Sequence, residues 1–199
     1  MSKMKIYGAP GSRASRSIWC AKEAGAPFEV VEIQWENLKT PEYLAVNPNG
    51  KVPGFADGDL KLFESLAINL YIAKKHGTGK LYPSNPADEA RVLQWSFWAA
   101  TEVEPNALPA LLLALGYSKD EAAAKAGEAK IKAPLAVLND HLKTRQWLVG
   151  NDFSVADLNV ASVVGMAKAG KIDIAYAPNV EAWLGRCFAR PARNPASTE

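Results

Sequence analysis

The 199-residue chain has few of the residues that usually build disulfides or metal sites. Its two cysteines, Cys20 and Cys187, lie far apart in the sequence and form neither a C-x-x-C redox pair nor half of a zinc site. The two histidines, His76 and His141, also stand alone. We therefore expect buried, reduced thiols and no metal or other cofactor.

The chain also lacks a large excess of either charge sign and has no long apolar run. The 23 Lys and Arg residues nearly balance the 21 Asp and Glu residues, and no dense basic run forms a patch for nucleic acid or anionic lipid. No stretch approaches the roughly 20 apolar residues of a membrane span, and the N-terminal segment lacks the apolar core of a signal peptide. We expect a cytoplasmic protein whose partners include neither nucleic acid nor a membrane.

What is present is a change of pattern along the chain. Residues 4–76 alternate strand-like and helix-like segments in the order strand, helix, strand, helix, two strands and helix. The last two strands are joined through Asp57-Gly58, a dipeptide favoured by type I′ hairpins. Ser65 is placed to cap the final helix. The first half therefore predicts an α/β domain of the form βαβ-α-ββα.

After a Gly- and Pro-rich linker the strand signals stop, and the rest predicts an all-helical bundle. Prolines 105 and 109 indicate a bend in the first long helix. A tail rich in proline after residue 190 is expected to be irregular. The predicted helices span about 87–115, 119–143, 154–169 and 179–189, and the predicted parts of the chain are a first domain 1–77, a linker 78–86 and a second domain 87–199.

Four segments carry a resemblance to a known family. Residues 47–53 read N-P-N-G-K-V-P, and residues 64–72 read E-S-L-A-I-N-L-Y-I after the D-G hairpin. Residues 10–17 read P-G-S-R-A-S-R-S, and residues 150–157 read G-N-D-F-S-V-A-D. This combination resembles cytosolic glutathione S-transferases of the serine type, with theta-, phi- or delta-like features, as in a bacterial member.

The resemblance implies a thioredoxin-like first domain with a mixed four-stranded sheet, followed by a helical domain. It also implies a detoxification enzyme that conjugates the thiolate of its co-substrate glutathione to small hydrophobic electrophiles, and a homodimer. Ser12 then corresponds to the hydroxyl that stabilises the thiolate at the start of the first helix. Ser15 and Tyr7 are the alternatives, and a plain helix cap is the simpler interpretation of Ser12.

The glutathione site follows from the same resemblance. Glu64 and Ser65 correspond to the partners of the γ-glutamyl end, where a helix N-terminus favours a carboxylate. Val52 offers its peptide edge to the cysteinyl unit, and its bond to Pro53 is implied to be cis. Lysines 39 and 51 correspond to partners of the glycyl carboxylate, whereas Gly50 stands where insect-type relatives have histidine.

The remaining assignments concern the second substrate and the packing. The resemblance places the electrophile near Pro10, Glu102 and Asn106. Trp95 and Trp98 are expected to be core or interface aromatics, Ser154 and Asp157 a capping box, and Arg16 a residue that holds parts of the protein together through a carboxylate.

Two alternative functions stay open. One is a non-catalytic, transferase-like binding or interaction module. The other is a glutathione-dependent isomerase or dehalogenase on the same scaffold, although the surroundings of Ser12 differ from the S-S-C-S-x-R opening of the isomerases.

Overall fold

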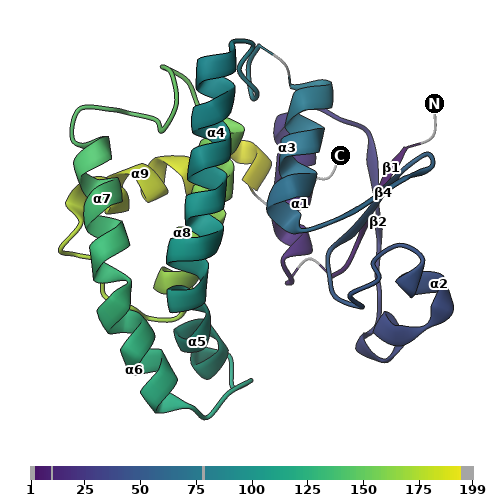
Figure 1. Ribbon diagram of the computed structural model, residues 1–199, viewed down its shortest axis with the longest axis horizontal. Coiled ribbons are helices and arrows are strands. Elements are labelled where there is room, and N and C mark those ends of the chain that lie inside the picture. The colour runs from purple at the N-terminus through teal and green to yellow at the C-terminus, as the bar shows by residue number, and fades with distance from the viewer. Residues whose placement is uncertain (1–2, 10, 78, 194–199) are drawn as a thin grey trace. The chain divides into compact units, whose positions relative to one another are not determined.

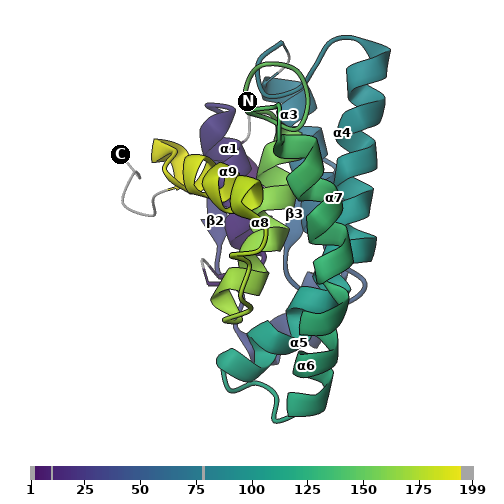
Figure 2. The ribbon, with the colours of Figure 1, turned by 90° about the vertical axis from the view of Figure 1, so that its left-hand side faces the viewer.

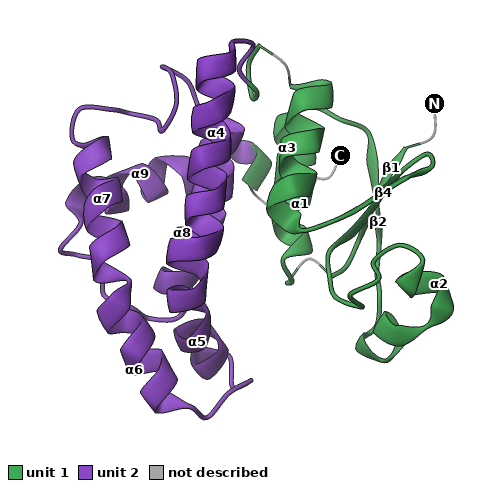
Figure 3. Cartoon of the chain, viewed as in Figure 1, with its two compact units in different colours: residues 1–82, 192–199 green, residues 83–191 purple. Residues whose placement is uncertain are grey.

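The computed structural model describes residues 3–9, 11–77 and 79–193. The chain divides into two compact units, residues 1–82 with 192–199 and residues 83–191 (Figure 3). The first unit contains the sheet and the second is helical (Figure 1).

The first unit is built on a four-stranded mixed sheet with the strand order β2-β1-β3-β4. Strand β1 pairs in parallel with β2 and antiparallel with β3, and β3 pairs antiparallel with β4. The predicted thioredoxin-like βαβ-α-ββα order is therefore confirmed. The strands are β1 (Met4–Tyr7), β2 (Phe28–Val31), β3 (Gly54–Asp57) and β4 (Leu60–Phe63).

The hairpin between β3 and β4 differs from its prediction in turn type. Asp57 is the last residue of β3 and pairs with Leu60, so the two turn residues are Gly58 and Asp59. Gly58 has a φ of 60°, but Asp59 does not share a positive φ. A type I′ turn needs positive φ at both central residues, so that assignment was wrong. The glycine still supplies the left-handed residue that allows the strands to reverse.

The helices of the first unit cover its sheet. Helices α1 and α3 pack against each other, and the buried Cys20 thiol on α1 donates to the Asn69 carbonyl of α3 at 3.3 Å. Burial raises the pKa of the Cys20 thiol, which therefore stays protonated, as expected for a structural cysteine. The helical segments are α1 (Ala14–Glu23), the 3₁₀ turn Trp35–Lys39, α2 (Pro41–Leu44) and α3 (Ser65–His76).

The helices of the second unit refine two of the predictions. The expected long helix with a bend consists of α4, a π-helical turn and α5, and Pro105 lies in the first turn of α5. The expected helix 119–143 is divided at Ile131 into α6 and α7. The segments are α4 (Pro86–Trp98), the π turn Ala99–Val103, α5 (Glu104–Ala114), α6 (Glu121–Lys130), α7 (Lys132–Leu142), α8 (Val155–Ala169), α9 (Pro178–Phe188) and the 3₁₀ turn Pro191–Arg193.

Helix α8 forms the core of the second unit. It is apolar on nearly all sides and packs against α4, α5 and α9 (Figures 1 and 2). The predicted capping box of Ser154 and Asp157 at its N-terminus is confirmed. Asp157 is fully buried and also accepts hydrogen bonds from the Leu148 amide and the Trp183 indole, both at 2.9 Å. The carboxylate therefore joins the start of α8 to the preceding loop and to α9.

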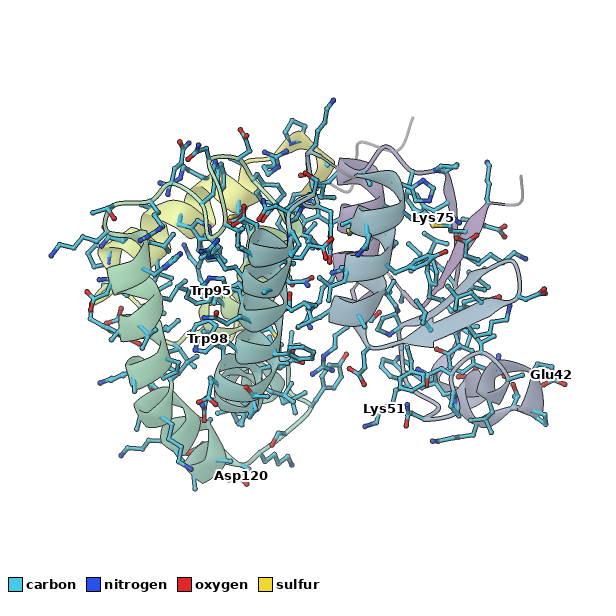
Figure 4. The ribbon with its side chains drawn as sticks, turned by 45° about the horizontal axis from the view of Figure 1, so that its top comes forward. Glu42, Lys51, Lys75, Trp95, Trp98 and Asp120 are labelled. Atoms are coloured by element: carbon cyan, nitrogen blue, oxygen red, sulfur yellow. The ribbon has the colours of Figure 1, made fainter. Side chains whose placement is uncertain are left out.

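Two tryptophans of α4 belong to the packing between helices. The rings of Trp95 and Trp98 meet edge to face with centroids 5.0 Å apart, and the Trp95 ring lies 4.7 Å from that of His141 on α7. Both side chains lie between α4 and α7 in Figure 4. The prediction of a core role is confirmed for Trp95, which is 6% exposed.

Candidate functional site

Three segments of the first unit meet at Gly8, just beyond the end of β1. A Cβ atom on Gly8 would lie 3.2 Å from Ser12 Oγ, 3.2 Å from Val52 Cβ and 2.8 Å from Ala14 Cβ. Gly8 also has a φ of 140°, which other residues rarely adopt. The missing side chain thus lets the start of α1 and the segment before β3 approach each other. Ser12 and Val52, 40 residues apart in sequence, become neighbours.

The Ser12 hydroxyl lies just before α1. It donates to the Ala9 carbonyl at 2.7 Å and accepts from the Ala14 amide at 3.1 Å. The bond from the Ala14 amide resembles that of a helix cap. The bond to the Ala9 carbonyl uses the single proton that the Ser12 hydroxyl can donate. Rotation of that proton toward a bound anion leaves the Ala14 contact in place. Capping and anion stabilisation are therefore compatible at this side chain.

The segment before β3 is held from behind by two side chains that the sequence analysis did not assign. The Asn47 amide is buried and donates to the Lys51 carbonyl at 2.6 Å and to the Pro53 carbonyl at 3.2 Å. The Tyr43 hydroxyl donates to the same Lys51 carbonyl at 2.7 Å, and burial raises the pKa of Tyr43 to about 12, which keeps this donor protonated. The carbonyls on both sides of Val52 are thus fixed.

The bond between Val52 and Pro53 is cis, which confirms the expected isomer. The signal for Asn47 was present in the sequence, because it opens the N-P-N-G-K-V-P run. A sequence motif does not show which carbonyls an amide will reach.

Glu64 and Ser65 lie at the N-terminus of α3, but Ser65 does not occupy the predicted cap position. Glu64 occupies the cap position with a φ of 68° and no side-chain capping bond, and Ser65 is the first helical residue. Ser65 is 4% exposed, and its hydroxyl accepts a hydrogen bond from the buried Arg16 guanidinium at 3.2 Å. The assignment of Ser65 as N-cap was wrong because this hydroxyl faces α1 instead of its own helix end.

The backbone of Glu64 is itself informative. A positive φ at a non-glycine residue costs on the order of 1–3 kcal/mol and is common where the chain clamps a ligand. Glu64 is exposed, so its carboxylate is available at the helix N-terminus beside the Ser65 amide. This end of α3 offers an acceptor for an amino group next to donors for a carboxylate.

The two predicted lysines differ in their surroundings. Lys39 Nζ donates to the Asn49 carbonyl at 3.0 Å. A Cβ atom on Gly50 would lie 2.6 Å from Lys39 Nζ and 2.7 Å from the Leu38 carbonyl oxygen, so a larger residue at this position would displace Lys39. Lys51 is exposed on the same loop (Figure 4). The presence of glycine where insect-type relatives have histidine thus has a packing reason.

The other candidates are more scattered. Tyr7 is half-buried at the end of β1, with its ring 6.2 Å from that of Tyr43, and Ser15 lies within the first turn of α1. Pro10 lies outside the described residues. Glu102 and Asn106 belong to the second unit, where the Asn106 amide donates to the Glu102 carbonyl at 2.7 Å.

The described residues form neither a metal cluster nor a membrane-spanning helix. Across 3–9, 11–77 and 79–193, no three His, Cys, Asp or Glu side chains are grouped to hold a metal ion. Within the same ranges, no helix combines the length and apolarity needed to cross a membrane.

Comparisons with known proteins agree on one family. Residues 2–74 match the family described as glutathione S-transferase, N-terminal domain, and residues 103–191 match glutathione S-transferase, C-terminal domain. Glutathione S-transferase 1 of Zea mays is 35% identical over 209 residues, which cover 96% of this chain and 94% of that protein. Glutathione S-transferase PARB of Nicotiana tabacum is 33% identical over 203 residues, covering 95% and 94%.

Solved structures show the same similarity. The theta class glutathione S-transferase of Xanthomonas axonopodis pv. citri, solved with glutathione bound, has a TM-score of 0.88 and 30% identity, covering 97% of this chain and 96% of that one. Poplar glutathione transferase F1 has a TM-score of 0.84 and 29% identity, covering 97% and 95%.

Proposed function

This chain belongs to the glutathione S-transferase family and acts as a glutathione transferase, and we propose that Ser12 stabilises the thiolate that attacks small hydrophobic electrophiles. The observation that carries the proposal is the meeting of Ser12 and Val52 at Gly8. A tripeptide paired with the backbone of Val52 would have its cysteinyl sulfur beside the Ser12 hydroxyl. That hydroxyl and the N-terminus of α1 would both favour the anion.

We assign the rest of glutathione to the neighbouring side chains. Glu64 takes the γ-glutamyl amino group, and the Ser65 hydroxyl and amide take its carboxylate. The Arg16 guanidinium, 3.2 Å from the Ser65 hydroxyl, adds positive charge at this end. Lys39 and Lys51 provide two cations for the glycyl carboxylate. Lys51 belongs to the loop that precedes Val52, and Lys39 packs against that loop through its bond to the Asn49 carbonyl.

Conjugation then follows from the chemistry of the thiol. The thiol of a free cysteine has a pKa of about 8.5, so most of it is protonated at neutral pH. A site that lowers this pKa toward about 6–7 converts most of the bound co-substrate into the nucleophile. The thiolate sulfur forms a bond to the electrophilic carbon, and the leaving group departs with its electron pair. We propose that Pro10, Glu102 and Asn106 line the electrophile site.

The test is a pair of assays on the purified protein. We expect retention on immobilised glutathione and conjugation of chlorodinitrobenzene at a rate that saturates with glutathione. Retention without turnover would instead support a non-catalytic module. Failure to bind glutathione at all would refute the site.

Alanine at Glu64 or at Ser65 should weaken glutathione binding more than it slows the following step. Each substitution removes a contact to the γ-glutamyl end, far from the sulfur. Loss of a charge-assisted hydrogen bond corresponds to about 10- to 150-fold in affinity. Isothermal titration calorimetry with glutathione measures the dissociation constant, and single-turnover kinetics measures the chemical step.

Glu42→Ala is the matched control, because Glu42 is also an exposed glutamate of the first unit. It should bind glutathione like the wild type. Thermal melts of Ser65→Ala separate a lost ligand contact from a lost Arg16 contact within the fold. Unchanged dissociation constants in both alanine variants would contradict the assignment.

We propose a homodimer in which α4 contributes to the interface. Leu93 and Phe97 lie one turn apart on this helix and are 38% and 65% exposed, so they form an apolar strip open to solvent. Burial of such a strip against a second subunit is favourable at about 25 cal/mol per Å² of apolar surface.

Glutamate at Phe97 should therefore dissociate the dimer, because dimerisation would bury an unpaired charge. Analytical ultracentrifugation measures the mass, which is expected at twice 21.5 kDa for the wild type and at 21.5 kDa for the variant. Val137→Glu is the control, since Val137 is 58% exposed on α7. A wild-type protein that sediments as a monomer at micromolar concentration would contradict the dimer.

Two further expectations remain proposals. We place the enzyme in the cytoplasm, in line with its cytosolic family. We also keep the predicted domain ranges 1–77 and 87–199 with a linker at 78–86, which the division after Tyr82 supports in part.

A further inference from the structure

The second unit contains an open hollow of about 500 Å³ where the segment after α7 faces α9. Three of its lining side chains are cationic: Lys143, Arg145 and Arg186. Among the residues that the structure describes, no acidic side chain lines it and no ion pair joins any of the three cations to a carboxylate. The hollow therefore concentrates positive charge that the described residues do not neutralise.

The Arg186 side chain is held in place, but one of its hydrogen-bond donors has no acceptor among the described residues. One of its terminal nitrogens donates to the Gln146 carbonyl at 3.1 Å, and its guanidinium lies 5.8 Å from the centre of the Trp147 ring. Its Nε is buried and has no hydrogen-bond partner among the described residues. A buried charged donor without an acceptor is costly, and the negative charge of an anion in the adjoining hollow would offset part of that cost.

The other cations come from the short connection after α7. Arg145 donates to the His141 carbonyl at 3.3 Å, which fixes its side chain near the C-terminus of that helix. Lys143 is exposed at the end of the same helix. Two arginines with fixed anchors and an exposed lysine suit an anion that carries more than one negative charge.

Neutral polar groups complete the lining. Asn179, in the first turn of α9, receives its orientation from Asn139, because its main-chain and side-chain amides donate to that residue at 2.9 and 3.2 Å. Thr144 and Gln146 add a hydroxyl and an amide to the lining. These groups can donate to further oxygens of the same ligand.

We propose that this hollow binds the diphosphate group of a small molecule, either free pyrophosphate or the diphosphate of a nucleotide. Guanidinium groups bind phosphate oxygens in a bidentate manner, and three cations match the charge of a diphosphate better than that of a single carboxylate. None of these residues belongs to the predicted glutathione site, so the proposal stands apart from the proposed function.

The experiment is isothermal titration calorimetry of the full chain with inorganic pyrophosphate, with ADP and with adenosine. Glutathione is present at saturation in every titration, so that its own site is filled. We expect pyrophosphate and ADP to bind with affinities that fall as salt is added, and adenosine not to bind. Tighter binding of ADP than of pyrophosphate would identify a nucleotide as the source of the diphosphate. The reverse order would identify free pyrophosphate.

The variant Arg145→Gln/Arg186→Gln should weaken pyrophosphate binding at least about tenfold, because it removes two charged donors. Lys125→Gln/Lys130→Gln is the matched control, since both lysines are exposed on α6 and do not line the hollow. The control should bind pyrophosphate like the wild type. Glutathione conjugation should be unchanged in both variants. Equal loss of binding in the two variants would show only a general charge effect and would overturn the proposal.

A second readout does not depend on the folding of an arginine variant. Fluorine NMR of the protein labelled with 5-fluorotryptophan resolves the resonance of Trp147, which a Trp147→Phe variant assigns. Pyrophosphate bound at Arg186 should shift this resonance, because the guanidinium lies over the Trp147 ring. Absence of binding in the wild type, or binding that leaves the Trp147 resonance in place, would overturn the proposal.

Discussion

Alanine at Ser12 is expected to lower turnover about 10- to 100-fold while leaving glutathione affinity nearly intact. The affinity should persist because the peptide edge at Val52 and the contacts at Glu64 and Ser65 do not involve this hydroxyl. The thiolate, however, loses the donor that we assign to it. One preorganised donor to an oxyanion is worth about 2.7–4 kcal/mol, and the more diffuse charge of sulfur should give a smaller effect.

The pKa of bound glutathione should rise in the same variant. The ultraviolet absorbance of the bound thiolate, followed against pH in wild type and variant, measures this shift directly. Lower occupancy of the thiolate at neutral pH should account for most of the loss in turnover. Coincident titration curves would reject Ser12 as the thiolate donor.

Stability and two further variants show which hydroxyl acts on the thiolate. If Ser12 were only a cap, its replacement would cost about 1 kcal/mol of stability through the Ala14 amide, and turnover per folded molecule would not change. Ser15→Ala and Tyr7→Phe remove the two alternative hydroxyls without touching the Ala9 or Ala14 contacts of Ser12. A large loss of turnover in either would transfer the assignment to that residue.

Alanine at Asp157 should destabilise the protein by about 4 kcal/mol, a large part of the 5–15 kcal/mol that holds a typical domain folded. The carboxylate is fully buried and accepts from the Leu148 and Ser154 amides, the Trp183 indole and the Ser154 hydroxyl. Its removal leaves these buried donors without an acceptor, and each such loss costs about 1–3 kcal/mol. Urea unfolding followed by tryptophan fluorescence measures the free energy of unfolding.

Asp152→Ala is the control for this second prediction. Asp152 lies in the loop just before α8 and is exposed, so its replacement should change the free energy of unfolding by less than about 0.5 kcal/mol. The loss of stability in Asp157→Asn should lie between those of Asp157→Ala and Asp152→Ala, because an amide keeps one of the two acceptor oxygens. Equal stability of Asp157→Ala and the wild type would show that the buried network does not hold α8 to α9.

Local patterns predicted most of the fold. The alternation of strand-like and helix-like segments before residue 77 and its absence afterwards depend on neighbouring residues, so the α/β and helical parts could be recognised without tertiary information. The capping box at Ser154 and Asp157 was found for the same reason, since both residues lie within one helical turn. The turn at Gly58 was assigned to the wrong type because its conformation depends on where the paired strands end.

In the candidate site, too, the local motifs could be recognised from the sequence but the contacts between them could not. The motifs around residues 12, 52 and 64 were recognisable because each is continuous in sequence. The partners that orient them were not, because Asn47 reaches past Val52 to two carbonyls and Arg16 reaches Ser65 across 49 residues. The Asn47 contacts depend on the path of the loop before β3, and the Arg16 contact depends on the packing of α1 against α3. Sequence spacing encodes neither.

By itself, the sequence determined the fold class, the family and the segments that could hold glutathione, because these depend on short-range periodicity and on continuous motifs. Only the tertiary structure decided that Gly8 brings Ser12 beside Val52, that the Ser65 hydroxyl faces Arg16, and that Asp157 joins α8 to α9. Each of these contacts joins residues distant in sequence. Packing selects their partners by shape and by the need to satisfy every buried polar group.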